Sequence, residues 1–190
     1  PVWLVSSTHH DEEAKIARFI PEIKEAAPGL LTIIAPRHPQ RGYEVNSAVK
    51  EISGLSTSLR SAGDEIIPET DVYIADTIGE MGLWYSLCPL VFIGGSLIPH
   101  GGQNFMEPSR MRDAVIVGPH MHNFTDAMNR AKKADAIIQV NDVLELKDTV
   151  INLLKSPELL EAKRSLAYNW ASGENKVLDG ILDKVRGYIS

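Results

Sequence analysis

The chain lacks several features that would place it in a specialised class of protein. It has a single cysteine, Cys88, among 190 residues, which excludes a disulfide framework and leaves no second thiol for a zinc knuckle. No apolar run approaches the roughly 18 residues of a membrane-spanning helix, and no basic, cleavable leader opens the chain. Positive charge is not in excess either, because the formal net charge is -6. A basic face for bulk nucleic-acid binding is therefore not expected.

What remains is the composition of an ordinary globular protein, 44% hydrophobic and 23% charged. A chain of this size should bury about 70% of its unfolded surface, which is enough for a core without covalent staples. It opens with Pro-Val-Trp-Leu-Val and no initiator Met, inside a predicted strand. We therefore expect a single domain over residues 1–190 that is a fragment of a longer protein.

Short apolar runs alternate with longer amphipathic segments along the chain. Several runs are apolar at consecutive positions, which is typical of strands buried on both faces of a parallel sheet. The alternation predicts βαβ units and a doubly wound, Rossmann-like α/β sheet with a helical C-terminal tail. The predicted strands are residues 2–6, 30–35, 57–60, 72–76, 90–94, 114–118 and 136–140. The predicted helices are residues 11–26, 43–53, 104–112, 123–134, 142–155, 157–172 and 175–188.

Ligands of such sheets bind outside the carboxyl ends of the strands, so the loops at those ends are the candidate sites. The first reads Ser-Thr-His-His-Asp-Glu-Glu after Ser6. It brings hydroxyls and imidazoles to a helix N-terminus, which favours an anion. The same residues also fit a plain Ser/Thr cap followed by solvated acids.

Two further loops carry residues that suit a phosphorylated ligand. Pro-Arg-His-Pro-Gln-Arg follows Ala35, and an arginine fork binds phosphate or carboxylate through two hydrogen bonds, although solvated loop arginines are equally common. Asp-Thr-Ile-Gly-Glu-Met-Gly starts at Asp76, where glycine allows a close backbone approach. Glu80 in this loop is also placed to cap the following helix.

The segment from Gly94 to Pro108 contains two glycine pairs and runs into a predicted helix start. Backbone amides of such a loop can form an anion site. Glu107 lies about one turn into the helix, where its carboxylate could accept hydrogen bonds from ribose hydroxyls. The alternative is a mobile glycine loop with Glu107 as a helix cap.

A metal site is not expected, although the chain has six histidines. No two of them have the i, i+4 spacing of helical ligands, and no acidic partner completes a set.

Together these motifs resemble a known family. Ser-Thr-His-His-Asp-Glu-Glu, Pro-Arg-His-Pro-Gln-Arg, Asp-Thr-Ile-Gly-Glu, Gly-Gly-Ser-Leu…Gly-Gly-Gln-Asn…Glu-Pro and Val-Gly-Pro-His…Asn-Phe occur in this order. They look like the C-terminal half of the 3-deoxy-D-manno-octulosonic acid (Kdo) transferases of Gram-negative lipopolysaccharide synthesis. The resemblance runs from Val2 to the end of the chain. It departs from the family at Asp11, where a glycine is more usual.

The resemblance implies the donor-binding half of a GT-B glycosyltransferase that moves Kdo from CMP-Kdo to a lipid A precursor, with inversion and without a metal or other cofactor. The general base, the acceptor site and the membrane anchor would lie in the N-terminal half, outside this chain. We therefore expect no catalytic residue here, a soluble and inactive fragment, and a full-length protein on the cytoplasmic face of the inner membrane.

The resemblance also assigns site residues. The implied CMP contacts are Pro36, Arg37, Ile78, Gly79, Glu80, Asn104, Phe105, Met106 and Glu107. Candidate contacts to the sugar or phosphate are Thr8, His9, Ser96, Gly101 and Gly102.

Two other functions fit the same sequence. One is another GT-B enzyme, such as a UDP-sugar transferase or an epimerase. The other is a non-catalytic nucleotide-binding module. The family resemblance further implies that the last helix, residues 175–188, packs on the N-terminal domain through an apolar stripe. In the fragment we expect that helix to be mobile or docked on a second copy.

Overall fold

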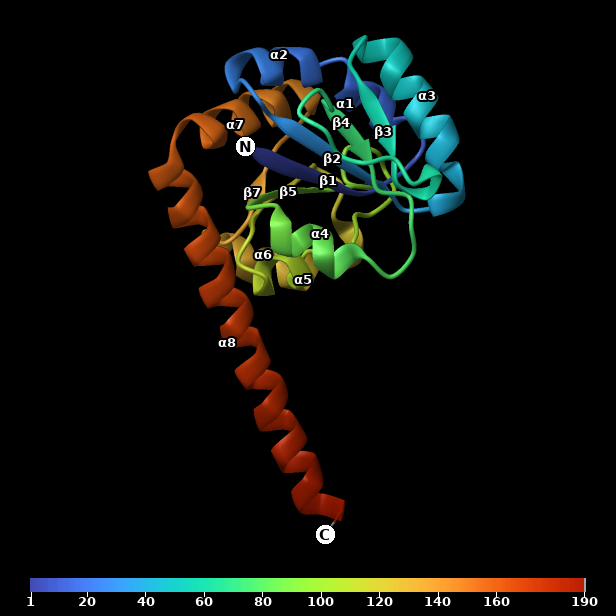
Figure 1. Ribbon diagram of the computed structural model, residues 1–190. Coiled ribbons are helices and arrows are strands. Elements are labelled where there is room, and N and C mark those ends of the chain that lie inside the picture. Colours follow the sequence, from blue (N-terminus) through green and yellow to red (C-terminus); the bar gives the residue numbers. More distant parts are fainter. Residues whose placement is uncertain (190) are drawn as a thin grey trace.

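The protein forms one parallel sheet of seven strands in the order β3-β4-β2-β1-β5-β6-β7 (Figure 1). The computed structural model describes the backbone of residues 1–189 and the side chains of residues 1–174. Every strand pairing is parallel, which confirms the predicted α/β class. The strands are β1 (Val2–Thr8), β2 (Leu31–Pro36), β3 (Thr57–Leu59), β4 (Val72–Ile74), β5 (Leu90–Ile93), β6 (Ala114–Val117) and β7 (Ile138–Gln139).

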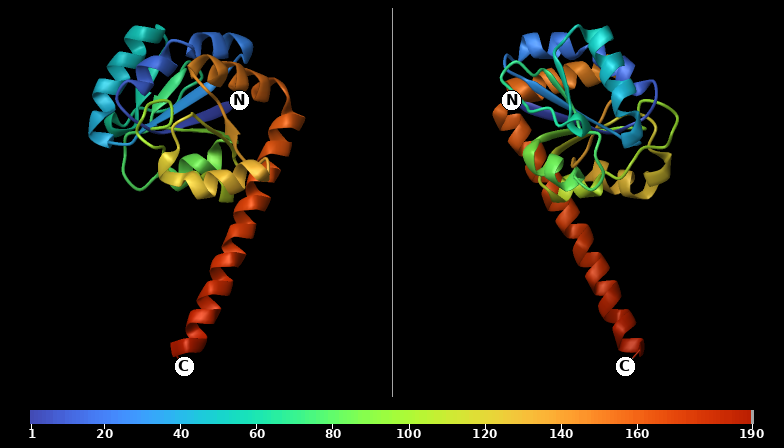
Figure 2. Two further views of the ribbon diagram at one scale, coloured as in Figure 1. Left: turned by 180° about the vertical axis from the view of Figure 1, so that it is seen from behind. Right: turned by 45° about the vertical axis from the view of Figure 1, so that its right-hand side comes forward.

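Helices cover both faces of the sheet (Figure 2). α1 (Glu12–Ala17), α2 (Ile20–Ala26), α3 (Gly42–Ser53) and α7 (Val143–Lys155) supply one apolar cluster with the strands. α4 (Met81–Leu87), α5 (Met106–Arg110) and α6 (Thr125–Lys133) supply the other. The short 3₁₀ turns are η1 (Pro39–Arg41), η2 (Arg60–Ala62) and η3 (His122–Phe124). Two apolar faces explain why β4, β5 and β6 are buried along their whole length.

The predicted helix over residues 11–26 is wrong as a single element, because the structure has α1 and α2 with a break between them. Pro21 lies in the first turn of α2. Its ring would clash with the Ala17 carbonyl in a continuous helix, and its missing N–H costs nothing at a helix start. The predicted helix over 104–112 shortens to α5, and the one over 123–134 begins as η3. The seven-residue α4 was not among the predicted helices.

The C-terminal tail is helical, as predicted, but it is one helix rather than two. α8 (Pro157–Ile189) runs through Gly173 without a break, which is tolerable because a glycine inside a helix costs only about 1 kcal/mol relative to alanine. Up to Trp170 the helix contributes to both apolar clusters. The predicted stripe on residues 175–188, and its docking, lies outside the side chains that the structure describes.

The single cysteine lies in the core of the protein. Cys88 is 1% exposed, and burial raises the pKa of its thiol to about 12, as expected for a small core residue. Among the described residues, no helix combines the length and apolarity needed to cross a bilayer.

Candidate functional site

The strand order changes direction between β1 and β5, so the loops after these two strands separate and leave a crevice at the carboxyl edge of the sheet. β1 ends in a bulge, with a register shift between Ser6 and Thr8, and Ser7 takes a left-handed backbone with φ 54°. Gly94 packs directly against this bulge, since a Cβ built on it would lie 2.5 Å from the Ser7 carbonyl oxygen. The ends of β1 and β5 are therefore held together by backbone contact.

Four of the predicted contact residues line one cavity beside this bulge. Pro36 and Arg37 come from the end of β2, and Ile78 and Gly79 from the loop after β4, around a volume of about 310 Å³. Ser7, which sequence reasoning did not single out, lines the same cavity. Arg37 is exposed, and Ile78 is 87% exposed, although isoleucine normally lies in a core.

Glu80, a predicted CMP contact, does not line this cavity, and it does not act as a helix cap, contrary to one interpretation of the sequence. It stands at the N-cap position of α4 without a capping hydrogen bond. Its Oε1 accepts a hydrogen bond from Nη2 of Arg60 at 2.8 Å, and Oε2 accepts one from the Thr77 hydroxyl. The Arg60 guanidinium, followed by Thr77, lowers the pKa of Glu80 to about 2. Arg60 was not predicted, because nothing in its local sequence indicates its distant partner.

His9 lies between the loop after β2 and the loop after β5. Its ring is 3.8 Å from that of His100 and 5.9 Å from that of His38, centroid to centroid, and its Nε2 is 3.1 Å from Nε2 of Gln103. Burial, followed by His100, His38 and Arg37, lowers the pKa of His9 to about 4. At neutral pH the ring is therefore uncharged, in surroundings that favour an incoming anion.

The glycine loop does not offer the free amides that the sequence suggested. The backbone N–H groups of Gly95, Ser96 and Leu97 all donate to the carboxylate of Glu12, at 2.6, 3.1 and 3.0 Å. Gly102 donates its N–H to the Gly95 carbonyl at 2.8 Å. This loop does form a cradle for an anion, but the anion in it is the protein's own Glu12 side chain.

Two other candidate contacts are likewise turned inward. Ser96 is fully buried, and its hydroxyl donates to the Ile93 carbonyl and accepts from the N–H of Gly118. Thr8 is fully buried and donates its hydroxyl to Glu13 at 2.8 Å. In this structure neither hydroxyl faces the cavity.

Two of the three acids after His10 are not solvated, contrary to the simpler interpretation of that motif, while Asp11 is exposed. Glu12 is fully buried, and Glu13 is only 3% exposed. Burial raises the pKa of Glu12, and hydrogen bonds from the Gly95, His9 and Leu97 amides act in the opposite direction. Asp11, where the resemblance leads us to expect glycine, has a left-handed φ of 73°. Glycine adopts that conformation more readily than aspartate, which is a physical reason for the expected glycine and leaves the departure itself unexplained.

The segment at residues 104–107 is divided between core and surface. Asn104 precedes α5, and its Oδ1 accepts the N–H of Met106, the first residue of that helix, at 3.0 Å. Phe105 is fully buried and stacks on Trp170 at 5.6 Å. Glu107 is exposed and makes no capping hydrogen bond, which argues against its interpretation as a helix cap.

The glycine pair before this segment is packed against the loop after β6. Gly101 and Gly102 have positive φ, 97° and 77°. A Cβ would clash with Asn123 at the first position and with Met121 at the second.

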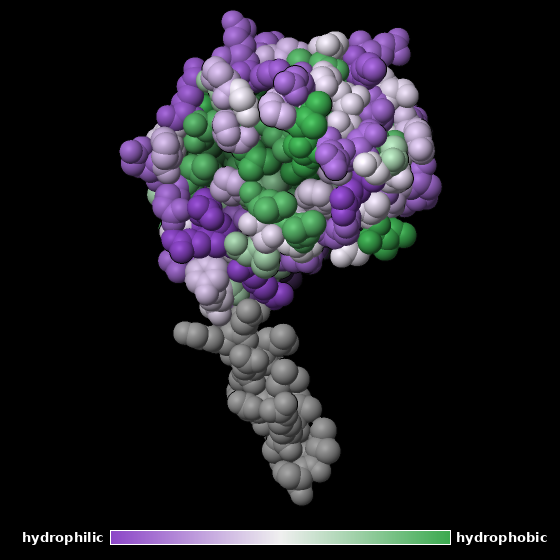
Figure 3. Space-filling model, viewed as in Figure 1, coloured by the Kyte–Doolittle hydropathy of each residue, from purple (hydrophilic) through white to green (hydrophobic). Residues whose placement is uncertain are grey.

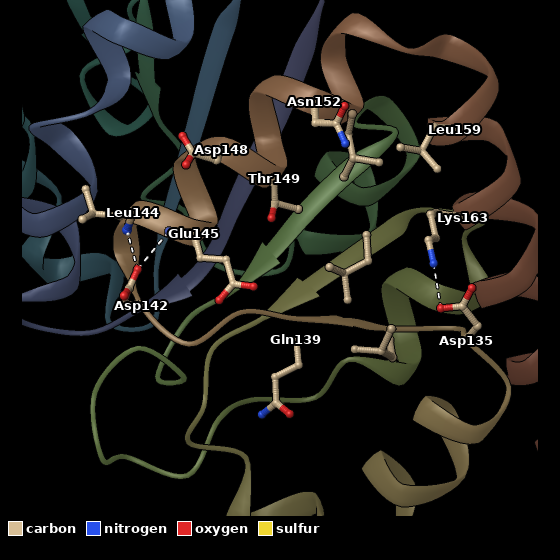
Figure 4. A pocket seen from close by; sticks show the side chains of 13 residues that line it. Asp135, Gln139, Asp142, Leu144, Glu145, Asp148, Thr149, Asn152, Leu159 and Lys163 are labelled. Atoms are coloured by element: carbon tan, nitrogen blue, oxygen red, sulfur yellow. Dashed lines mark hydrogen bonds and ion pairs between the residues drawn. The ribbon is translucent and has the colours of Figure 1, made fainter.

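A larger cavity lies elsewhere, between the edge strand β7, α7 and the start of α8, with a volume of about 850 Å³ (Figure 4). Apolar side chains also gather in a hollow on the face of the molecule that is turned to the viewer in Figure 1 (Figure 3). Four carboxylates line the cavity, and its one lysine, Lys163, is paired with one of them. This charge disfavours a phosphorylated ligand. The four carboxylates are those of Asp135, Asp142, Glu145 and Asp148.

The described residues contain no cluster of three or more His, Cys, Asp or Glu side chains placed to hold a metal ion.

Comparison with known proteins identifies related sequences and shows how much of their length this chain covers. No family model matches the chain. It is 35% identical over 191 residues to the 3-deoxy-D-manno-octulosonic acid transferase of Bordetella pertussis, covering 96% of this chain and 44% of that one. The chain thus spans less than half the length of the curated relatives it matches.

Among solved structures, one domain of similar length is related to this chain in both sequence and fold. The C-terminal CMP-Kdo binding domain of WaaA from Acinetobacter baumannii superposes with a TM-score of 0.83 at 34% identity, covering 89% of this chain and 88% of that one. Anabaena Alr3699/HepE, solved in complex with UDP, has a TM-score of 0.66 at 13% identity and covers 98% of this chain and 48% of that one, so it shows the fold alone. The predicted GT-B half-fold is confirmed. The chain belongs to the family of 3-deoxy-D-manno-octulosonic acid transferases, in which it corresponds to the C-terminal domain.

Proposed function

We propose that this chain binds CMP-Kdo in the cavity between the loops after β2 and β4. The observation that supports this most is that Pro36, Arg37, Ile78 and Gly79, which the family resemblance assigns to CMP, line one cavity of about 310 Å³. The cavity lies at the carboxyl edge of the sheet, beside the point where strand order reverses.

The chemistry of the lining suits a nucleoside monophosphate ester. Arg37 offers a planar fork of N–H donors to the phosphate, and the exposed side chain of Ile78 offers an apolar surface to the base. When the bond between Kdo and CMP breaks, negative charge grows on the departing phosphate. A preorganised positive group such as Arg37 stabilises that charge, and this kind of electrostatic stabilisation is usually the largest catalytic contribution.

We further propose that the full-length protein transfers Kdo to a lipid A precursor at the cytoplasmic face of the inner membrane, with inversion and without a metal. In this account residues 1–190 form one domain of a two-domain enzyme. The general base and the acceptor site lie outside the chain, so the isolated domain binds donor without turnover. Its affinity for CMP should be weak, because one wall of the cleft is absent and the cost of ordering the ligand remains.

Replacing Arg37 by alanine should lower the affinity for CMP by about tenfold or more, because a lost charge-assisted hydrogen bond costs about 1.5–3 kcal/mol. Calorimetric titration of CMP and UDP into the domain measures this directly. Arg18→Ala is the matched control, since Arg18 is exposed at the end of α1. Equal CMP affinity in both variants, or tighter binding of UDP than of CMP by the wild type, would contradict the proposal.

Replacing Glu107 by alanine should weaken CMP binding and leave the melting temperature unchanged. The side chain is exposed and caps no helix. It does not line the cavity of Arg37 and Ile78, but the family resemblance assigns it to CMP, where it would accept hydrogen bonds from ribose hydroxyls. A calorimetric titration paired with a thermal melt separates the two roles. A lower melting temperature with unaltered affinity would instead assign Glu107 to the stability of α5.

A further inference from the structure

Two consecutive glutamates at the start of α1 are buried, and they reach in different directions. Glu12 is fully buried and Glu13 is 3% exposed. Neighbouring residues on a helix point about 100° apart around its axis. The two carboxylates therefore contact different parts of the protein: Glu13 contacts the loop after β2, which lines the proposed donor cavity, and Glu12 contacts the neighbouring loop after β5.

Glu12 holds the loop after β5. Oε1 accepts the N–H groups of Ser96 and Leu97 at 3.1 and 3.0 Å, and Oε2 accepts those of Gly95 and His9 at 2.6 and 3.1 Å. All four partners are N–H donors, so they suit an ionised carboxylate, which only accepts hydrogen bonds. A protonated carboxyl or an amide at this position would place one of its own hydrogens against a backbone N–H. Through these bonds one side chain fixes the loop that carries His100 to the loop that carries His9.

Glu13 holds the loop after β2. Its Oε1 accepts hydrogen bonds from Nη1 of Arg41 at 3.0 Å and from the Thr8 hydroxyl at 2.8 Å. Arg41 closes the turn η1, four residues after Arg37. The other arginine of the Pro-Arg-His-Pro-Gln-Arg motif is therefore engaged inside the protein, and it anchors the loop that presents Arg37.

We propose that Glu12 and Glu13 are positioning residues, which together set the loop after β2, part of the donor cavity, relative to the neighbouring loop after β5 without touching the ligand. This inference rests on the proposed function for its ligand, CMP. Both carboxylates extend from neighbouring residues of α1, and each one binds a different loop. The two loops are therefore held at fixed positions relative to this helix and to each other. Arg37 and the imidazoles of His9 and His100 then face the crevice in a fixed arrangement before the donor arrives, which lowers the cost of ordering them on binding.

Amide hydrogen exchange tests, without any ligand, whether Glu12 holds the loop after β5 in place. In Glu12→Gln the N–H groups of Gly95, Ser96 and Leu97 should exchange at least tenfold faster than in the wild type, with the central strands unchanged. Glu22→Gln is the control, because it makes the same chemical change at an exposed glutamate of α2, whose carboxylate pairs with Lys147 and contacts neither loop. Unaltered exchange in a folded Glu12→Gln would overturn the proposal.

Nucleotide affinity tests the consequence for the site. Glu13→Gln should weaken CMP binding about tenfold at a temperature where the variant is fully folded. It should have little further effect in an Arg37→Ala background, because it acts through the loop that presents Arg37. Full additivity of the two changes, or wild-type affinity in Glu13→Gln, would contradict the inference. Should Glu12→Gln fail to fold, Glu13→Gln and this cycle decide the outcome.

The failure of the proposed function gives a different result. A wild-type domain that does not bind CMP would overturn the donor assignment, and the exchange measurement would still decide whether the carboxylates hold the loops.

Discussion

Replacing Gly94 by alanine should lower the free energy of unfolding by about 3 kcal/mol, because the added methyl group meets backbone rather than a movable side chain. A Cβ at this position would lie 2.5 Å from the carbonyl oxygen of Ser7 and 2.7 Å from the Cα of Thr8. The end of β5 would have to move away from the bulge in β1, and this contact positions Ser7, which lines the candidate cavity. Denaturant unfolding followed by circular dichroism measures the change.

Gly173→Ala is the control for this prediction. Gly173 lies within α8, where an added Cβ would meet nothing within 4 Å. The substitution should therefore stabilise the helix by about 0.5–1 kcal/mol. If Gly94→Ala unfolds at the same denaturant concentration as the wild type, the close packing of β1 against β5 is not as the structure has it.

The second large effect should appear in the dependence of stability on pH, and it arises at Asp113. This side chain is 2% exposed, and its Oδ2 has no hydrogen-bond partner among the described residues. Burial raises the pKa of Asp113 to about 8, with a smaller opposing contribution from Arg164. The folded protein therefore binds a proton that the unfolded chain releases near pH 4. The contribution of Asp113 to stability is complete below that pH and is lost as the pH rises towards 8.

His9 changes stability in the opposite direction. Its pKa falls to about 4 in the folded protein, so the unfolded chain binds the extra proton below about pH 6.5, and stability decreases as the pH drops. The two effects oppose each other between pH 4 and 6.5. The effect of Asp113 is then separated from that of His9 between pH 6.5 and 8, where a slope of up to about 1.4 kcal/mol per pH unit is expected.

Asp113→Asn should remove that slope, since the amide does not titrate. Between pH 6.5 and pH 8 the unfolding free energy of the wild type should fall by up to about 2 kcal/mol, whereas that of the variant should not show this fall. The difference between the two proteins should therefore widen by that amount as the pH rises. Asp148→Asn, at an exposed position on α7, is the control that should follow the wild type. A wild type equally stable at both pH values would contradict a raised pKa at Asp113.

The sequence predicted the class of fold because that class depends on local patterns. Consecutive apolar residues identified the buried parallel strands, and every predicted strand corresponds to one in the sheet. The helix over residues 11–26 was placed without its interruption, because the steric effect of Pro21 depends on a carbonyl four residues away. The helix α4 was missed since it has seven residues, with Gly82 inside it.

The site was partly predictable for the same reason. Loops at the ends of parallel strands must lie on one edge of the sheet, so Arg37 and Gly79 could be expected to meet. The acids were different, since Glu12 and Glu13 have the pattern of a solvated first turn of a helix. Their actual partners are 83 and 28 residues away along the chain, at Gly95 and Arg41. Such long-range polar contacts leave no periodic signal in the sequence.

The central claim is that the donor nucleotide occupies the cavity of about 310 Å³ at the carboxyl edge of the sheet, not the larger acidic cavity beside β7. Titrating CMP into the isotopically labelled domain and following backbone amide resonances tests this most directly. The account predicts progressive shifts at Arg37, Ile78 and Gly79, with Thr149 and Asn152 of the acidic cavity unchanged. Shifts confined to the α7 side, or no shift with CMP at any concentration, would contradict it.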